Sequence, residues 1–177
     1  MLMQLAERGK VGLDDPLVKY IPQYKPVYQE NSGPTTLRQV ATHTSGLHVD
    51  AGKAFWHYLS NFRWVVTKGQ EKIVWGVTPK DLLANLNTVE IEYTPNAYPH
   101  YSNFGFQLLG IALERATGQP FEKYIKSSIL NPLRMNNADF NLSREQESRF
   151  AVGYTFLEPA NRSGAHKLAI PYRGCGI

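Results

Sequence analysis

The segment from Phe104 to Thr117 constrains the fold most, because it is apolar at helical spacing and has almost no polar face. Two apolar stripes run along it, one made of Phe104, Leu108, Ile111 and Ala112 and the other of Phe106, Leu109, Leu113 and Ala116. A helix that is apolar on most sides is a buried helix. Gly118 is placed to cap it, and Pro120 prevents its continuation. We therefore expect a buried helix over residues 104–117.

Helix signals also occupy the first part of the chain. The stretch Met1–Arg8 has the pattern of the last turns of a helix whose beginning is missing, and Gly9 is placed as its left-handed cap. Asp15-Pro16 is typical of an N-cap followed by proline at the first helical position, in a short element that Pro22 ends. These signals predict two short helical elements before residue 23.

Three more helices are predicted further along. Thr36-x-x-Gln39 is a capping box that begins a helix, and this helix must stop near residues 44–46. Thr78-Pro79 begins another, which carries leucines inward. Phe121 opens an amphipathic helix that Pro132 terminates. Together with the buried helix, they predict a mainly helical body.

Two regions depart from this pattern. Residues 49–77 form an irregular, aromatic-rich excursion that holds all three tryptophans, so we expect it to pack on its own aromatic cluster, on the body beneath it, or as a lid over a pocket. Residues 150–156 and 167–170 are candidate short strands. Helices dominate, and a closed sheet of several strands is not expected within these residues. We interpret 1–177 as a single, partial domain.

The bulk composition excludes several classes of protein. Hydrophobic residues make up 42% and charged residues 19% of the 177, as in globular proteins. The net charge is +4, but Lys and Arg are scattered, so we expect no nucleic-acid partner. Cys175 stands alone, which rules out an internal disulfide, and no zinc-ligand pair occurs. No apolar run is long enough to span a bilayer, and the first residues lack the pattern of a signal peptide.

The tripeptide Tyr101-Ser102-Asn103 precedes the buried helix and carries the functional signal. A hydroxyl nucleophile needs a group that removes its proton and returns it to the leaving group, and a tyrosine beside a cation can do both. An amide two residues away can orient that cation and a substrate carbonyl. Residues i and i+2 of an extended turn point the same way, so Tyr101 and Asn103 can face one cleft. The alternative is that Ser102 or Asn103 only caps the helix and Tyr101 is a core aromatic.

Four segments in order resemble the class C β-lactamase-like family, which includes D-alanyl-D-alanine peptidases and esterases. They are Leu5–Pro16 with Lys19–Pro22, the His-Thr-Ser-Gly-Leu segment within Val40–Leu47, Tyr101–Gly110 with the Tyr-x-Asn motif, and Asn131–Met135, similar to a Pro-Leu-Gly-Met turn. They span about residues 1–140. One departure is Pro95-Asn96, where relatives often carry Pro-Gly.

The resemblance implies a fold class and an acyl-serine mechanism. The chain would be a mainly α fragment, the helical lobe of an α/β (α+β) serine β-lactamase/DD-peptidase-like fold, with most of the central antiparallel sheet missing. Tyr101 would be the catalytic proton shuttle, and Asn103 would bind substrate and orient the lysine. The substrate would be a small amide or ester, and the reaction would need no metal or cofactor. The protein would be located in the periplasm or cell envelope.

The sequence contains no Ser-x-x-Lys, Lys-Thr-Gly or His-Thr-Gly. We therefore expect the chain to be a truncated member that is inactive alone; the alternative is a non-catalytic relative that binds a ligand or partner. Other candidate residues have simpler interpretations. His43 and His48 are expected to be structural or surface residues rather than metal ligands, and Ser45 to be a turn residue. His100 could tune Tyr101 or have no such role.

Overall fold

The computed structural model describes residues 1–26, 33–49, 83, 86, 89, 91–149 and 151. Its elements in chain order are α1 (Leu2–Glu7), the 3-10 helix η1 (Leu17–Lys19), α2 (Leu37–Ala41), α5 (Asn103–Thr117), α6 (Phe121–Ile125), the π-helical η4 (Lys126–Leu130) and α7 (Arg144–Arg149). Within this described part, β pairing is limited to two isolated bridges, Pro16–Thr36 and Leu47–Ile91. The expected helical lobe is therefore confirmed.

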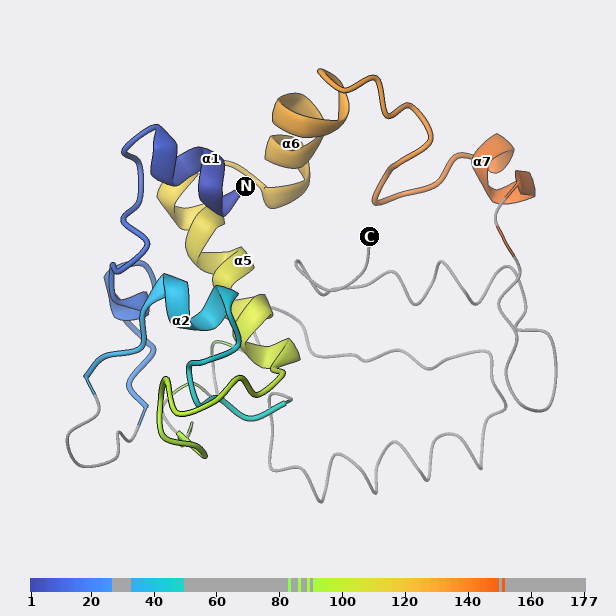
Figure 1. The fold of residues 1–177 in the computed structure, drawn as a ribbon. Coiled ribbons are helices and arrows are strands. Elements are labelled where there is room, and N and C mark those ends of the chain that lie inside the picture. Colours follow the sequence, from blue (N-terminus) through green and yellow to red (C-terminus); the bar gives the residue numbers. More distant parts are fainter. Residues whose placement is uncertain are drawn as a thin grey trace, which may run out of the picture.

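Helix α5 lies at the centre of this lobe, with α2 packed against it and α6 following from its C-terminal end (Figure 1). All seven residues from Gln107 to Leu113 are buried, as are Phe104 and Gly105. Seven consecutive residues cover every face of an α-helix, so α5 is enclosed on most sides, as its sequence predicts. The helix ends at Gly118, whose φ of 68° gives the expected left-handed cap.

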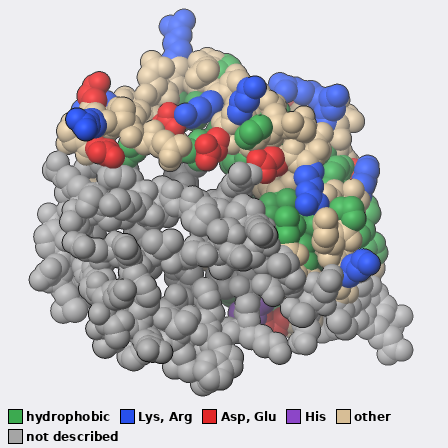
Figure 2. Space-filling model, turned by 180° about the vertical axis from the view of Figure 1, so that it is seen from behind, with side chains coloured by type: hydrophobic (Ala, Val, Ile, Leu, Met, Phe, Trp, Pro, Cys, Tyr) green, Lys and Arg blue, Asp and Glu red, His purple; other side chains and the backbone are tan. Residues whose placement is uncertain are grey.

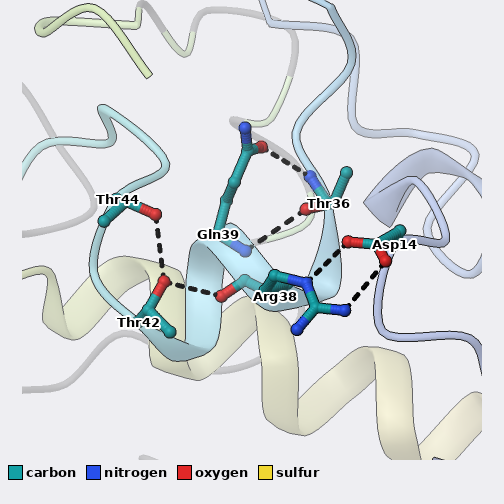
Figure 3. A network of polar contacts seen from close by, with 6 residues as sticks. All are labelled: Asp14, Thr36, Arg38, Gln39, Thr42 and Thr44. Carbon is teal, nitrogen blue, oxygen red and sulfur yellow. Dashed lines mark hydrogen bonds and ion pairs between the residues drawn. The ribbon is translucent and has the colours of Figure 1, made fainter. Parts of the chain in front are cut away.

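Local capping signals also fix α2 (Figure 3). The Thr36 side chain accepts from the Gln39 N–H at 3.2 Å, and the Gln39 side chain accepts from the Thr36 N–H at 2.9 Å. This is the predicted capping box. Arg38 donates two hydrogen bonds, of 2.7 and 2.9 Å, to the two carboxylate oxygens of Asp14, which attaches α2 to the preceding segment.

The prediction that Asp15 caps a helix was wrong. Pro16 occupies the N-cap position of η1, with an extended conformation, and the Asp15 carboxylate has other partners. It accepts from the Tyr20 hydroxyl, from the Gly12 N–H at 2.7 Å and from the Lys19 ammonium at 2.9 Å. The carboxylate therefore links the turn at residues 12–15 to the end of η1, rather than capping the start of that helix.

Helix α1 is anchored to α6 and η4. The Arg8 guanidinium donates to the Tyr124 hydroxyl at 3.1 Å, and the Gln4 side chain donates to the Ser128 carbonyl at 3.3 Å. Gly9 has a φ of 64°, so it caps α1 as predicted. The amphipathic helix from Phe121 is also confirmed, although its second half is π-helical rather than α-helical.

The turn after η4 has an exposed apolar surface. Leu133 is 66% and Met135 is 44% exposed, and between them Arg134 adopts a φ of 54°.

On the face shown in Figure 2, Lys and Arg side chains are interspersed with Asp and Glu. The expected absence of a nucleic-acid partner stays a prediction. None of the helices in the described ranges has the length and apolarity needed to cross a bilayer.

Several predictions fall outside the described residues. They are the aromatic excursion except for Val49, the two candidate strands except for Ala151, and most of the helix expected after Thr78-Pro79. Of the leucines expected to point inward from that last helix, Leu83 and Leu86 are described: Leu83 is half-buried and packs against the core, and Leu86 has no exposed surface.

Candidate active site

The side chains of Tyr101 and Ser102 lie in opposite environments at the start of α5. Tyr101 is 59% exposed, whereas Ser102 is only 1% exposed. Ser102 has an extended backbone, with φ −139° and ψ 107°, and Asn103 begins the helix in a half-buried position. The alternative that Tyr101 is a core aromatic is therefore wrong, while Ser102 does cap the helix. That Tyr101 and Asn103 face one cleft stays a prediction.

The buried Ser102 side chain holds the start of α5 through two hydrogen bonds. Its hydroxyl accepts from the Gly105 N–H at 2.9 Å and donates to the His48 carbonyl at 2.6 Å. The Phe104 N–H donates to the Val49 carbonyl at 3.0 Å. The first turn of α5 is thus bonded both to itself and to the segment that follows α2, so the backbone that follows Tyr101 is held in place.

Within the described residues, the ring of His43 contacts the ring of Tyr101. His43 follows α2 with a left-handed φ of 59°, and its imidazole lies 4.7 Å from the Tyr101 ring, centroid to centroid, at an angle of 40°. The same imidazole stacks on Phe106, also at 4.7 Å. Sequence reasoning missed this role, because no local signal indicates that residue 43 approaches residue 101.

His43 also bonds to both neighbours of Tyr101. Its Nδ1 accepts from the Ser102 N–H at 3.2 Å, and its carbonyl accepts from the His100 N–H at 2.7 Å. An Nδ1 that accepts an N–H carries no proton, so this geometry requires the neutral imidazole with its hydrogen on Nε2. Burial lowers the pKa of His43, which favours the same form.

His100, the histidine adjacent to Tyr101 in sequence, packs elsewhere. Its ring lies 4.0 Å from that of Tyr93, and Tyr93 in turn makes an edge contact with Tyr98 at 5.7 Å. Among the ring contacts of the described residues, His43 is thus the histidine placed against Tyr101. The candidate role of His100 in tuning Tyr101 receives no support from this arrangement.

The segment that carries His43 is joined to the segment before Tyr101. The Gly46 carbonyl accepts from the N–H groups of Glu92, at 2.8 Å, and Tyr93, at 3.2 Å, while the Asn96 N–H donates to the Thr44 carbonyl at 2.9 Å. Asn96 has a φ of 66°. Asparagine tolerates this region better than most residues, so Asn96 can adopt a conformation that otherwise favours glycine.

The described residues hold no group of three or more His, Cys, Asp or Glu side chains suited to a metal ion. His48 lies beside Glu92, with 3.7 Å between Nε2 and Oε2. Ser45 is buried and its hydroxyl accepts from the Leu47 N–H at 3.4 Å, which agrees with a turn residue. These observations leave Tyr101 and Asn103 as the candidate site residues, with His43 against the first.

Comparisons with known proteins agree with this architecture. The chain is 31% identical over 163 residues to the D-alanyl-D-alanine-carboxypeptidase/endopeptidase AmpH of Escherichia coli (strain K12), covering 92% of this chain and 39% of the relative. It is 28% identical to the putative penicillin-binding protein PbpX of Bacillus subtilis (strain 168), covering 86% of this chain and 32% of that protein. The chain therefore spans about two fifths or less of the length of these relatives.

Similarity in structure points the same way. A β-lactamase/D-alanine carboxypeptidase from Yersinia pestis, solved with citrate, superposes with a TM-score of 0.71 at 28% identity, covering 98% of this chain and 44% of that one. The expected fold class is thereby confirmed. The family described as Beta-lactamase matches residues 1–171. With the Tyr-x-Asn motif at the exposed start of a buried helix, the chain belongs to the β-lactamase family.

Proposed function

We propose that this chain supplies the proton-transferring tyrosine and the orienting asparagine of an acyl-serine hydrolase. Tyr101 would take the proton from the attacking serine hydroxyl and return it to the leaving group, while Asn103 would orient the lysine and the substrate carbonyl. The observation that carries the proposal is the exposed phenol of Tyr101 at the start of α5, over a buried Ser102. A general acid–base group must be both accessible and held in place.

The substrate would be a small amide or ester: a β-lactam, a D-Ala-D-Ala-type peptide or a simple ester. The name of the E. coli relative supports the peptide class, and family membership supports an acyl-enzyme route. A periplasmic or cell-envelope location follows from the same resemblance. No metal or cofactor enters this chemistry, because proton transfer and serine attack suffice for acyl transfer.

The acyl-accepting serine would come from a Ser-x-x-Lys segment that this sequence does not contain. Without a nucleophile the covalent route is closed, so the 177-residue chain should not form an acyl-enzyme. Treating the purified chain with fluorescent penicillin or a fluorophosphonate tests this directly. Covalent labelling at any serine would contradict the assigned roles.

A chimera tests whether Tyr101 performs the chemistry. The aligned part of E. coli AmpH is replaced by this chain, and acylation by fluorescent penicillin is timed. Replacing Tyr101 with Phe should slow acylation about 10²- to 10⁴-fold, the usual contribution of general acid–base catalysis. Tyr98→Phe is the matched control, because Tyr98 is similarly exposed, at 51% against 59% for Tyr101.

The outcomes separate the two candidate functions. Acylation that depends on Tyr101 but not on Tyr98 supports the hydrolase. A folded chimera in which Tyr101→Phe acylates as fast as its parent removes the proton-shuttle role. A chimera that folds but never labels favours the alternative, a non-catalytic relative that binds a ligand or partner. Inspection of the coding DNA upstream of Met1 for an in-frame Ser-x-x-Lys complements this test.

A further inference from the structure

We propose that His43 is a positioning residue for Tyr101: by holding the residues on both sides of the phenol and its ring, it sets where the proton-transferring oxygen lies. This inference rests on the proposed function of Tyr101, but the placement that it describes can be measured without catalysis.

Three contacts from His43 fall on three consecutive residues. The His43 carbonyl receives the His100 N–H at 2.7 Å, its Nδ1 receives the Ser102 N–H at 3.2 Å, and its ring lies 4.7 Å from the Tyr101 ring. The two hydrogen bonds hold the backbone N–H groups of the residues before and after Tyr101. The ring contact restricts the side chain itself, which is otherwise 59% exposed and open to several rotamers.

A second ring contact, with Phe106, holds the His43 ring in place. The ring stacks on Phe106 at 4.7 Å with an angle of 25° between the planes, and Phe106 belongs to the first turns of α5. The imidazole therefore bridges the central helix and Tyr101. A displacement of about 1 Å in a catalytic group can cost about a hundredfold in rate, so support of this kind matters for a proton shuttle.

Residue 43 has two requirements that few side chains meet together. Its φ of 59° disfavours most residues other than Gly, and Asn, Asp and His tolerate it best. Its side chain must also present an acceptor two bonds from Cβ, where Nδ1 meets the Ser102 N–H. Histidine in the neutral form satisfies both and adds a flat ring, and the lowered pKa of His43, caused by burial, helps to keep Nδ1 free of a proton.

The test compares His43→Asn with His43→Gly in the ¹⁵N-labelled 177-residue chain. Both residues accept a positive φ and both lack the ring, but only Asn retains an acceptor near the Nδ1 position. Exchange of the Ser102 amide with solvent deuterium should be about tenfold faster in the Gly variant than in the Asn variant, the factor expected for one hydrogen bond. The Gly118 amide, bonded to the Glu114 carbonyl at 2.9 Å, serves as the stability control.

The wild-type chain gives a second, independent readout. Long-range ¹H–¹⁵N correlation should show that His43 carries its proton on Nε2 at neutral pH, and a nuclear Overhauser spectrum should show cross-peaks between the His43 and Tyr101 rings. A proton on Nδ1 in the wild type, or equal Ser102 exchange in both variants, would overturn the proposal. Because the tautomer is read from the unmutated chain, poor folding of a variant does not remove the test.

The AmpH chimera then measures the catalytic consequence. The acylation rate at saturating penicillin should fall in the order wild type, His43→Asn, His43→Gly, while the dissociation constant of the non-covalent complex stays within about twofold. Equal rates in all three would contradict a positioning role. If Tyr101→Phe has no effect in that chimera, the proposed function fails, yet the exchange and tautomer results still decide whether His43 holds the loop.

Discussion

The Cα of Gly46 lies so close to the Tyr93 carbonyl that a Cβ at residue 46 would stand 2.0 Å from the carbonyl oxygen and 2.8 Å from the Cγ2 of Ile91. The close approach exists because the Gly46 carbonyl accepts the N–H groups of Glu92 and Tyr93. This contact joins the segment that carries His43 to the segment that leads to Tyr101.

Replacing Gly46 with Ala should therefore be strongly destabilising. Left-handed backbone costs an alanine about 1 kcal/mol, and the overlap with a backbone oxygen adds more, so we expect a total loss of about 3 kcal/mol or more. Gly118→Ala is the matched control, because Gly118 has a similar φ, 68° against 75°, but nothing within 4 Å of its Cβ position. Urea unfolding of both variants makes the comparison, and equal losses would contradict the close contact.

Ser102→Ala should cost about 1–2 kcal/mol of unfolding free energy, because it removes the cap of α5 and a buried bond to the His48 carbonyl. Ser143 is the matched cap, since its hydroxyl accepts from the Gln146 N–H at 3.2 Å at an exposed position before α7. Ser143→Ala should cost clearly less. Denaturant midpoints compare the two, and a smaller effect at Ser102 would argue against its structural role.

Arg134→Gly should stabilise the fold by about 0.5–1 kcal/mol. Arg134 has a φ of 54° at the position where the resembled Pro-Leu-Gly-Met turn has glycine. Glycine removes the strain of this conformation from the folded state, and we expect this gain to exceed the loss from the greater entropy of the unfolded chain. Asn131 has ordinary helical angles, φ −63° and ψ −48°, and Asn131→Gly should be neutral or destabilising. Thermal unfolding distinguishes them, and a lower melting temperature for Arg134→Gly would refute the prediction.

The free energy of unfolding at acid pH should depend on Asp15. The Tyr20 hydroxyl foremost, then the Gly12 N–H and Lys19, lower the pKa of Asp15 to about 2 from 3.8. A carboxyl whose pKa is lowered in the folded state stabilises fully above its unfolded pKa and loses this effect as pH falls through its folded pKa. The stability difference between wild type and Asp15→Asn should therefore shrink from about pH 4 to pH 2.

Tyr20→Phe provides the complementary measurement. Losing the phenol hydroxyl removes the largest cause of the shift, so the pKa of Asp15 should rise toward 3.8. Carbon-13 NMR of the labelled carboxyl reports this titration directly. An unchanged pKa in Tyr20→Phe would show that Gly12 and Lys19 alone account for the shift.

Features encoded in a few neighbouring residues could be predicted from the sequence. The capping box of Thr36 and Gln39, the left-handed cap at Gly118 and the burial of α5 each depend on chemistry within one or two turns. The family resemblance likewise depended on short segments in order. The start of α5 next to the Tyr101-Ser102-Asn103 tripeptide followed from the same local patterns, which left open whether Tyr101 is exposed or a core aromatic.

Contacts between distant segments could not be predicted in this way. Nothing local distinguishes His43 from His100 as the partner of Tyr101, because the choice depends on the φ of residue 43 and on how α2 packs against α5.

Asp15 was misassigned for a different reason, because its side-chain donors lie close to it in the sequence. An aspartate that caps a helix and one that binds other nearby groups have the same local sequence, and the competing donors Tyr20 and Lys19 decided the outcome.

The pairing of Leu47 with Ile91, and the bonds from Gly46 to residues 92 and 93, bring together two points of the chain that lie more than forty positions apart in the sequence. The entropy of closing a loop between fixed ends grows only slowly with its length. Changes in chain length between those two points should therefore cost little in loop-closure entropy, provided that His48 and Val49 remain, since their carbonyls accept hydrogen bonds from Ser102 and Phe104. Under the proposed function of Tyr101, we expect such length changes to leave the position of its phenol unaltered.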